Sequence, residues 1–187
     1  SHSDHFNPEI LSWSKKKKNV RYIFSDELLQ TKNTLPQDAT YLRKGEFYKD
    51  NSIKVKAFGS TDAGCSFLVG YNDKLLFHAG DLNNWHWKGK VSVDEALTYQ
   101  NNFLCELELL SERAEHINVA MFPLDPRLGN FFMRGGEQFV SRINTDYFLP
   151  MHFDESFNLV NTFEEIASKH NSKYLPITHR GQSYKLY

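Results

Sequence analysis

Several strand-like runs in this chain lie directly beside an aspartate or a histidine, and this pattern constrains the fold more than any other feature. The run 74–78 leads into Gly80-Asp81, the run 147–150 leads to His152, and the run 65–69 begins just after Asp62. His and Asp supply the nitrogen and oxygen ligands of zinc and related metals. The pattern therefore predicts a sheet that assembles a metal site along one edge.

The opening residues offer a second group of potential ligands. Ser1-His2-Ser3-Asp4-His5 contains two imidazoles and a carboxylate. Asn7 suits the N-cap and Pro8 the first turn of a short helix, which would fix the loop before it. A frayed terminus or a tag remnant would give the same string, so the choice depends on the rest of the chain.

The periodicity of the chain predicts one alternating α/β domain over residues 1–187. Apolar and polar residues alternate at period two over 53–58, as in half-buried strands, and 65–69 and 74–78 form a hairpin around 70–73. Ser92 and Glu95 make a capping box that opens a helix to about residue 114. Strands at 117–122 and 174–177 and a helix at 158–169 follow. A chain of 187 residues is too short for two comfortable domains.

The ordered set of ligands resembles the metallo-β-lactamase superfamily. The signature of that family is His-x-His-x-Asp-His, then a middle His, an Asp after Gly and a late His. His2, Asp4 and His5 match the end of the first motif, Asp81 the bridging aspartate and His152 the final histidine. The resemblance covers essentially the whole chain and is nearest to the branch that contains L-ascorbate-6-phosphate lactonase. It implies a four-layer αββα sandwich.

Two positions depart from the family pattern. The leading His of the first motif would fall one place before Ser1, so we expect the chain to begin inside the motif, with the opening strands of the family upstream. The middle His is absent, and its loop reads Phe58-Gly59-Ser60-Thr61-Asp62-Ala63-Gly64. Asp62 is the candidate replacement ligand. The number and identity of the metals stay open.

The resemblance also implies roles for the ligands. His2 and Asp62 would hold one metal, Asp4, His5 and His152 a second, and Asp81 would bridge them. Metals in such a pair lower the pKa of a bound water toward 7. Asp4 would be the catalytic residue that orients the hydroxide and receives its proton. Zinc is the first expectation, with manganese or iron as alternatives because an extra carboxylate favours harder ions.

Four residues are candidates for substrate binding. Trp85 and His86 follow the Asp81 turn, where they either wall a pocket or anchor a packed loop. Asp125 and Arg127 follow a strand and either bind substrate or form a structural ion pair. Together with the backbone N–H groups of Gly135-Gly136, Arg127 is the main hint of an anionic substrate.

Composition indicates which classes of partner and which cellular setting to expect. Charged residues make up 24% of the chain with a net charge of −1, which argues against a nucleic-acid partner. No apolar run approaches the roughly 20 residues of a membrane span. The two cysteines lack metal-type spacing and favour a reduced, cytoplasmic setting. A homo-oligomer is left open.

Together with the ligand pattern, the resemblance implies a metal-dependent hydrolase, and its lactonase branch implies an ester, lactone or phosphoester of a small metabolite as the substrate. One alternative is a phosphodiesterase, including an RNA-processing nuclease. A second, from a different class, is a non-catalytic metal-binding or interaction protein that keeps the fold, and the missing middle His is the feature that supports it.

Overall fold

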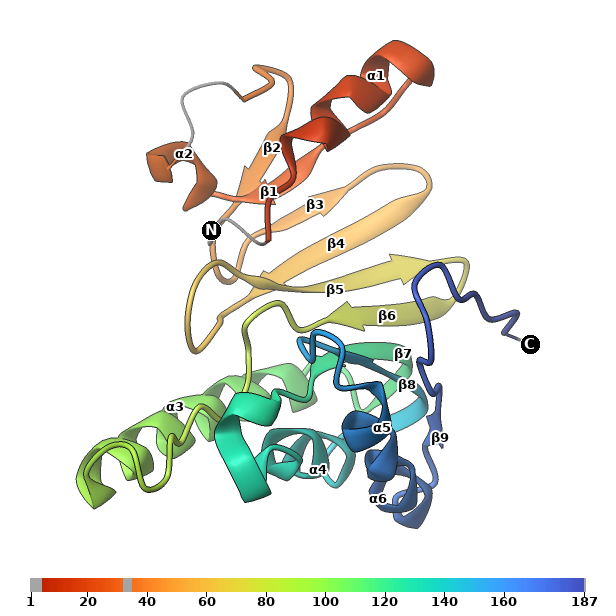
Figure 1. Cartoon of the computed structure of the whole chain (residues 1–187). Helices are drawn as coiled ribbons and strands as arrows, with labels where there is room; N and C mark the ends of the chain where they lie inside the picture. Colours follow the sequence, from red (N-terminus) through yellow and green to blue (C-terminus); the bar gives the residue numbers. More distant parts are fainter. Residues whose placement is uncertain (1–4, 32–34, 187) are drawn as a thin grey trace.

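The structure is a computed structural model that describes residues 5–31 and 35–186. A seven-stranded sheet in the order β3-β4-β5-β6-β7-β8-β9 and a two-stranded sheet, β1-β2, form its framework (Figure 1). The strands are β1 Ile23–Ser25, β2 Thr40–Leu42, β3 Phe47–Lys49, β4 Ile53–Phe58, β5 Ser66–Tyr71, β6 Lys74–His78, β7 His116–Pro123, β8 Asn144–Met151 and β9 Lys173–Tyr174. The helices are η1 Pro8–Ser12, α1 Trp13–Lys16, α2 Leu28–Thr31, α3 Val93–Ser111, η2 Pro126–Phe131, α4 Arg134–Val140, α5 Phe157–Val160, η3 Asn161–Phe163 and α6 Glu164–Lys169.

Strands β3 to β6 are antiparallel, with short turns between β3 and β4 and between β5 and β6 and a longer loop, 59–65, between β4 and β5. The predicted hairpin between β5 and β6 is confirmed. Its two turn residues, Asn72 and Asp73, both have positive φ angles, of 45° and 60°. Two positive φ angles are the requirement of a type I′ turn, whose twist matches that of the flanking strands.

Strands β6 to β9 are parallel, and this half of the sheet positions the candidate site. Parallel neighbours need crossover connections, which α3, α4 and α6 supply between successive strands. The carboxyl ends of β6, β7 and β8 therefore lie side by side at one edge. Asp81, Asp125 and His152 each follow one of these ends.

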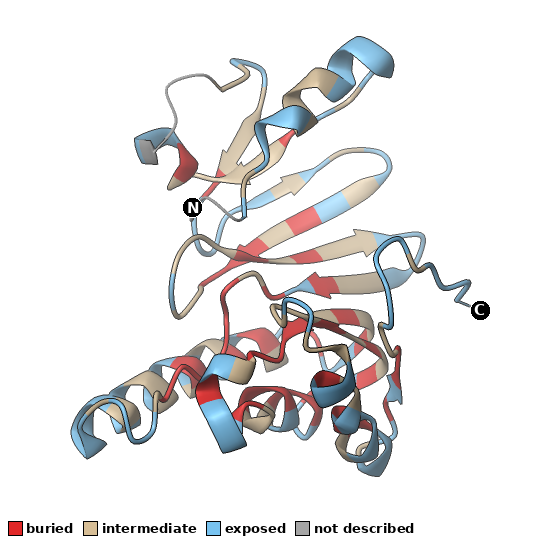
Figure 2. Ribbon diagram, viewed as in Figure 1, coloured by how far each residue is buried: buried red, intermediate tan, exposed pale blue. Residues whose placement is uncertain are grey.

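Two apolar cores hold the layers together. The larger lies between the seven-stranded sheet and helices α3, α4 and α6, and Phe103, Leu107 and Leu110 give α3 its fully buried face. The smaller joins the β1-β2 sheet to β4 through Leu42, Val55 and Ala57, and Phe67 and Val69 of β5 pack against it. Figure 2 shows the concentration of buried residues in the larger core.

The α/β class predicted from the sequence is confirmed. In Figure 1, α1 and α2 lie beside the small sheet and α3, α4 and α6 lie on the far side of the large sheet, so that two helical layers flank two sheets. The second sheet contains two strands within the described ranges. None of the helices described is long and apolar enough to cross a membrane.

Candidate metal centre

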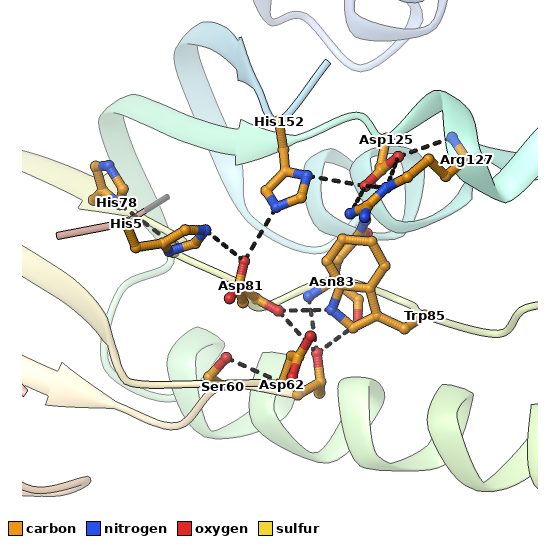
Figure 3. Close-up of polar contacts among 12 residues, drawn as sticks. His5, Ser60, Asp62, His78, Asp81, Asn83, Trp85, Asp125, Arg127 and His152 are labelled. Atoms are coloured by element: carbon orange, nitrogen blue, oxygen red, sulfur yellow. Dashed lines mark hydrogen bonds and ion pairs between the residues drawn. The ribbon is translucent and has the colours of Figure 1, made fainter. Parts of the chain in front are cut away.

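Two histidines from opposite ends of the chain converge on one buried aspartate. His5 Nε2 lies 3.1 Å and His152 Nε2 lies 3.3 Å from Asp81 Oδ1 (Figure 3). Within the described part of the chain, this is the one group of three or more His, Cys, Asp or Glu side chains that could hold a metal. The structure thus brings together three of the six ligands that the sequence suggested.

The geometry of this cluster fits a metal ion. Zinc binds imidazole nitrogen and carboxylate oxygen at roughly 2.0–2.2 Å in a tetrahedral arrangement, which places neighbouring ligand atoms about 3.3–3.6 Å apart. The two nitrogen–oxygen separations, 3.1 and 3.3 Å, are close to that range. Asp81 is only 1% exposed. A carboxylate so deeply buried needs cationic partners, and a metal ion would supply one.

The loop after β6 holds Asp81 in place. Gly80 has a φ angle of 56°, and a Cβ there would lie 3.0 Å from the Cys65 carbonyl oxygen, so glycine is required at this turn. Trp85 Nε1 donates to the Asp81 carbonyl oxygen at 2.8 Å. Thr61 Oγ1 accepts from the Asn83 amide and donates to the Asn83 carbonyl, which closes the loop against residues 59–64.

Asp125 fixes His152 from the side opposite Asp81. Its Oδ2 atom lies 2.9 Å from His152 Nδ1, and its carboxylate also accepts from the Arg127 side chain. A carboxylate behind a histidine sets the tautomer and orientation of the ring, as in metal sites. Asp125 and then Asp81 raise the pKa of His152 to about 10, against the effect of burial. Hydrogen bonds from His152 and Arg127 outweigh burial and hold the pKa of Asp125 far below its usual range.

The other predicted ligands are not part of this cluster. His2 and Asp4 lie outside the described residues, so their roles stay predictions. Asp62 is exposed, its amide donates to Ser60 Oγ at 3.3 Å, and it is absent from the ligand group. The structure does not bring Asp62 to the two histidines.

The candidate substrate residues lie behind the cluster. Trp85 is 4% and His86 1% exposed, and Trp85 packs edge-on against His152 with ring centroids 5.5 Å apart. His86 Nδ1 accepts from the Lys88 amide. This burial supports the packed-loop interpretation of Trp85 and His86 rather than direct contact with a substrate. The contacts of Asp125 and Arg127 with each other likewise correspond to the structural ion pair.

The glycine pair of α4 also has a packing role. Gly135 and Gly136 are buried, and a Cβ on Gly135 would lie 1.9 Å from Asn83 Oδ1. A Cβ on Gly136 would lie 2.9 Å from the Leu124 side chain and 3.0 Å from the Phe163 ring. A side chain at either position would meet the Asp81 loop or the core, and the expectation that their backbone receives a phosphate stays a prediction.

Sequence reasoning assigned no role to His78, which borders the site. A cavity of about 490 Å³ opens over the cluster and is lined by His5, His78, Gly80, His152 and Asp154, among others. Burial, followed by the proximity of His5, lowers the pKa of His78, and His78 Nδ1 accepts from the Gly80 amide at 3.1 Å. Strand alternation in the sequence could have identified His78, because it puts His78 on the sheet face opposite buried Phe77.

No family model matches this sequence, and no curated protein matches it significantly. Among solved structures, a protein of Parabacteroides distasonis ATCC 8503 named "putative metal-dependent hydrolase" is similar at a TM-score of 0.64 and 10% identity, over 94% of this chain and 71% of that protein. A Thermotoga maritima protein named "putative zn-dependent hydrolase of the metallo-beta-lactamase superfamily" is similar at a TM-score of 0.40 and 15% identity, over 65% of this chain and 55% of that protein. The first of these likenesses establishes that the chain shares its fold with a known structure.

Proposed function

We propose that this protein is a metal-dependent hydrolase that cleaves an ester, lactone or phosphoester bond of a small molecule. The observation that carries the proposal is the convergence of His5 and His152 on buried Asp81, at the carboxyl ends of parallel strands. The name of the Parabacteroides protein with the same fold gives independent support. The sequence resemblance to the metallo-β-lactamase superfamily agrees with it.

The described residues would have different roles in such a site. His5, Asp81 and His152 would hold the metal, and Asp125 keeps the His152 ring turned toward Asp81. A bound divalent ion supplies a hydroxide-forming water and polarises the oxygen of the scissile bond. Zinc suits two imidazoles and a carboxylate, and manganese or iron are the alternatives. We retain Asp4 as the proposed proton acceptor and Asp62 as a proposed further ligand.

His78 is positioned to contact the substrate. Because its Nδ1 accepts from the Gly80 amide, the neutral ring carries its proton on Nε2. A protonated ring nitrogen beside the cavity can donate a hydrogen bond to an oxygen of the substrate. Asp154 lines the same cavity.

The test combines metal analysis with a panel of substrates. Full-length protein is purified, its zinc, manganese and iron are quantified, and p-nitrophenyl esters, lactones, phosphomonoesters and a phosphodiester are offered. We expect one to two metals per chain and hydrolysis of at least one ester or lactone class. Asp81→Ala and His152→Ala should lose metal and reduce activity to background.

A matched variant guards against unfolding as the explanation. Asp146→Asn breaks the contact of another aspartate–histidine pair, Asp146 with His116 at 2.7 Å, at the opposite end of β8. This variant should keep both metal and activity. Purified protein that holds no metal, or Asp81→Ala protein that keeps its metal and its activity, contradicts the proposal. Hydrolysis of the phosphodiester alone would favour the nuclease alternative.

A further inference from the structure

A second cavity lies between the two sheets, next to the metal centre. It has a volume of about 280 Å³ and is walled by Phe6, Ile23, Phe24, Leu28, Cys65 and Phe67, among others. We call it the side cavity. Residues 23–25 of β1 line it together with Cys65, just before β5, and Phe67 of β5, so it lies beside the smaller core, against which Ile23, Cys65 and Phe67 also pack.

The side cavity and the cavity over the cluster adjoin one another. His5, His78 and Gly80 line both of them. A molecule whose reacting bond lies at the cluster can therefore extend a second group between the sheets. The two histidines stand where the cavities meet, so the polar part of the lining is concentrated at the junction.

The walls of the side cavity suit an uncharged group. No Lys, Arg, Asp or Glu is among the described residues that line it. Cys65 is half-buried in its wall, and burial raises the pKa of this thiol, which keeps it neutral. Ser25 Oγ lies 3.5 Å from Cys65 Sγ, so the serine hydroxyl has a contact within the wall. An ionised group in this cavity would lose its hydration without gaining a counter-charge.

The features that suggested an anionic substrate are engaged elsewhere. The Arg127 guanidinium binds Asp125, and its Nε atom lies 3.0 and 2.9 Å from the two carboxylate oxygens. Gly135 and Gly136 are packed against the Asp81 loop and the core. Neither feature lines the side cavity or the cavity over the cluster.

We infer that the side cavity binds an apolar acyl group, so that the substrate is an ester or lactone of a short carboxylic acid; this inference rests on the proposed hydrolase function. The volume is roughly twice that of an engineered 150 Å³ cavity that admits benzene, and so suits a chain of about six carbons or one aromatic ring. Hydrolysis adds the hydroxyl of water to the acyl carbon, breaks its bond to the alcohol oxygen and leaves the second water proton on that oxygen.

Binding of an alcohol series tests the cavity without requiring catalysis. Isotope-labelled full-length protein is titrated with 1-butanol, 1-pentanol and 1-hexanol, and amide shifts are followed by NMR. We expect shifts at Cys65 and Phe67 and an affinity that rises about fourfold per methylene, as burial of each CH₂ predicts. Ala63 lines the side cavity, so Ala63→Leu should weaken 1-hexanol binding at least tenfold.

Two further variants make the test specific. Ser25→Leu fills the cavity from β1 and should act like Ala63→Leu. Ala39→Leu places the same side chain outside both cavities and should leave 1-hexanol binding unchanged. Thermal denaturation of all three variants identifies any that fail to fold. Alcohol shifts that spread over the surface, or that survive both filling substitutions in folded protein, overturn the inference.

The ester series separates this inference from the proposed function. We expect kcat/KM to be at least tenfold higher for p-nitrophenyl hexanoate than for the acetate, and Ala63→Leu to abolish this preference while the acetate is still cleaved. Ester hydrolysis that ignores both chain length and Ala63→Leu overturns the acyl cavity and leaves the hydrolase proposal standing. Site-specific alcohol binding in metal-loaded protein without hydrolysis of any ester or lactone supports the cavity and overturns the hydrolase.

Discussion

The carboxylate of Asp125 has two cationic or polar partners, the His152 ring at 2.9 Å and the Arg127 side chain. Its low pKa keeps it ionised over the whole physiological pH range. At the scale of single residues, this is the group that decides which way the His152 ring faces. A metal bound by His152 would therefore depend on a residue that never touches it.

Asp125→Asn should weaken metal binding by about 10- to 100-fold, the usual cost of losing a carboxylate behind a metal-binding histidine. The amide retains the shape of the side chain but not its charge, so the ring loses its fixed orientation. Competition with a fluorescent chelator measures the change. Asp146→Asn is the matched control. Asp146 contacts His116, and both residues lie near the amino ends of β8 and β7, at the end of the strands opposite to the cluster. Equal affinities in the two variants would contradict the role given to Asp125.

Single residues also show what the sequence could and could not predict at the site. Asp81 and His152 follow strands whose apolar runs are visible in the sequence, and parallel pairing brings those strand ends together. The contact of Asp125 with His152 joins residues 27 positions apart and depends on the register of β7 with β8, which periodicity does not specify. His78 was overlooked because its place in the cavity lining depends on the tertiary fold, whereas Asp62 was chosen for its loop position in the family pattern, lies outside the described cluster and stays a prediction.

At the scale of elements, the strands were predictable where local chemistry determines them. The alternation in β4 and the turn between β5 and β6 are both local signals. The helix after β8 was expected to be continuous over 158–169 but is divided into α5, η3 and α6. Val160, Phe163 and Ala167 pack into the larger core at the i, i+3, i+7 spacing of one helical face, so periodicity indicates which face is buried but not the short 3-10 segment that divides the helix.

The link between this divided helix and β9 is Tyr174, whose hydroxyl donates to the Val160 carbonyl at 2.9 Å. Tyr174→Phe should cost about 1–2 kcal/mol of unfolding free energy, because the buried carbonyl loses its donor. Chemical denaturation at pH 8 measures this loss. Tyr71→Phe is the control, since Tyr71 is 50% exposed and should be nearly neutral.

The same residue predicts a pH dependence. Burial raises the pKa of Tyr174 above its ordinary value of about 10. A raised pKa in the folded state means that the stabilising contribution is complete below about pH 10 and is lost as the pH rises from there toward the folded pKa. Tyr174→Phe should therefore lose less stability than the parent between pH 9 and 11. Parallel pH profiles of the parent and the variant would contradict the shift.

At the scale of the whole molecule, the cluster brings His5, which precedes η1, to the residues that follow strands β6 and β8 of the large sheet. A ligand that binds the folded state alone stabilises it by about 2.7 kcal/mol at a free concentration 100 times Kd. For a chain of this size that corresponds to a rise in Tm of roughly 5–10 °C. Saturation with zinc should produce this shift, and a chelator should reverse it.

Two variants test whether the shift in Tm comes from metal bound at the cluster. His152→Ala should abolish the shift, whereas Asp146→Asn should preserve it. A shift of equal size in His152→Ala protein would place the metal elsewhere in the molecule.

The overall α/β architecture could be predicted from the sequence, because alternation of strands and amphipathic helices implies a sheet with crossover helices. The mixed order of the sheet and the small size of β1-β2 depend on long-range pairing that the sequence pattern does not show.

The edge-on packing of Trp85 against His152, with Trp87 stacked beside it at 5.8 Å, gives the molecule an optical property. Indole fluorescence is sensitive to the charge of neighbouring groups, and a metal ion held by His152 would place a positive charge beside the Trp85 ring. The third tryptophan, Trp13, is 52% exposed and supplies a background that this event leaves unchanged. We therefore expect the emission of Trp85 to change when zinc is added to metal-free protein, and a fluorescence titration of the parent beside Trp85→Phe measures it.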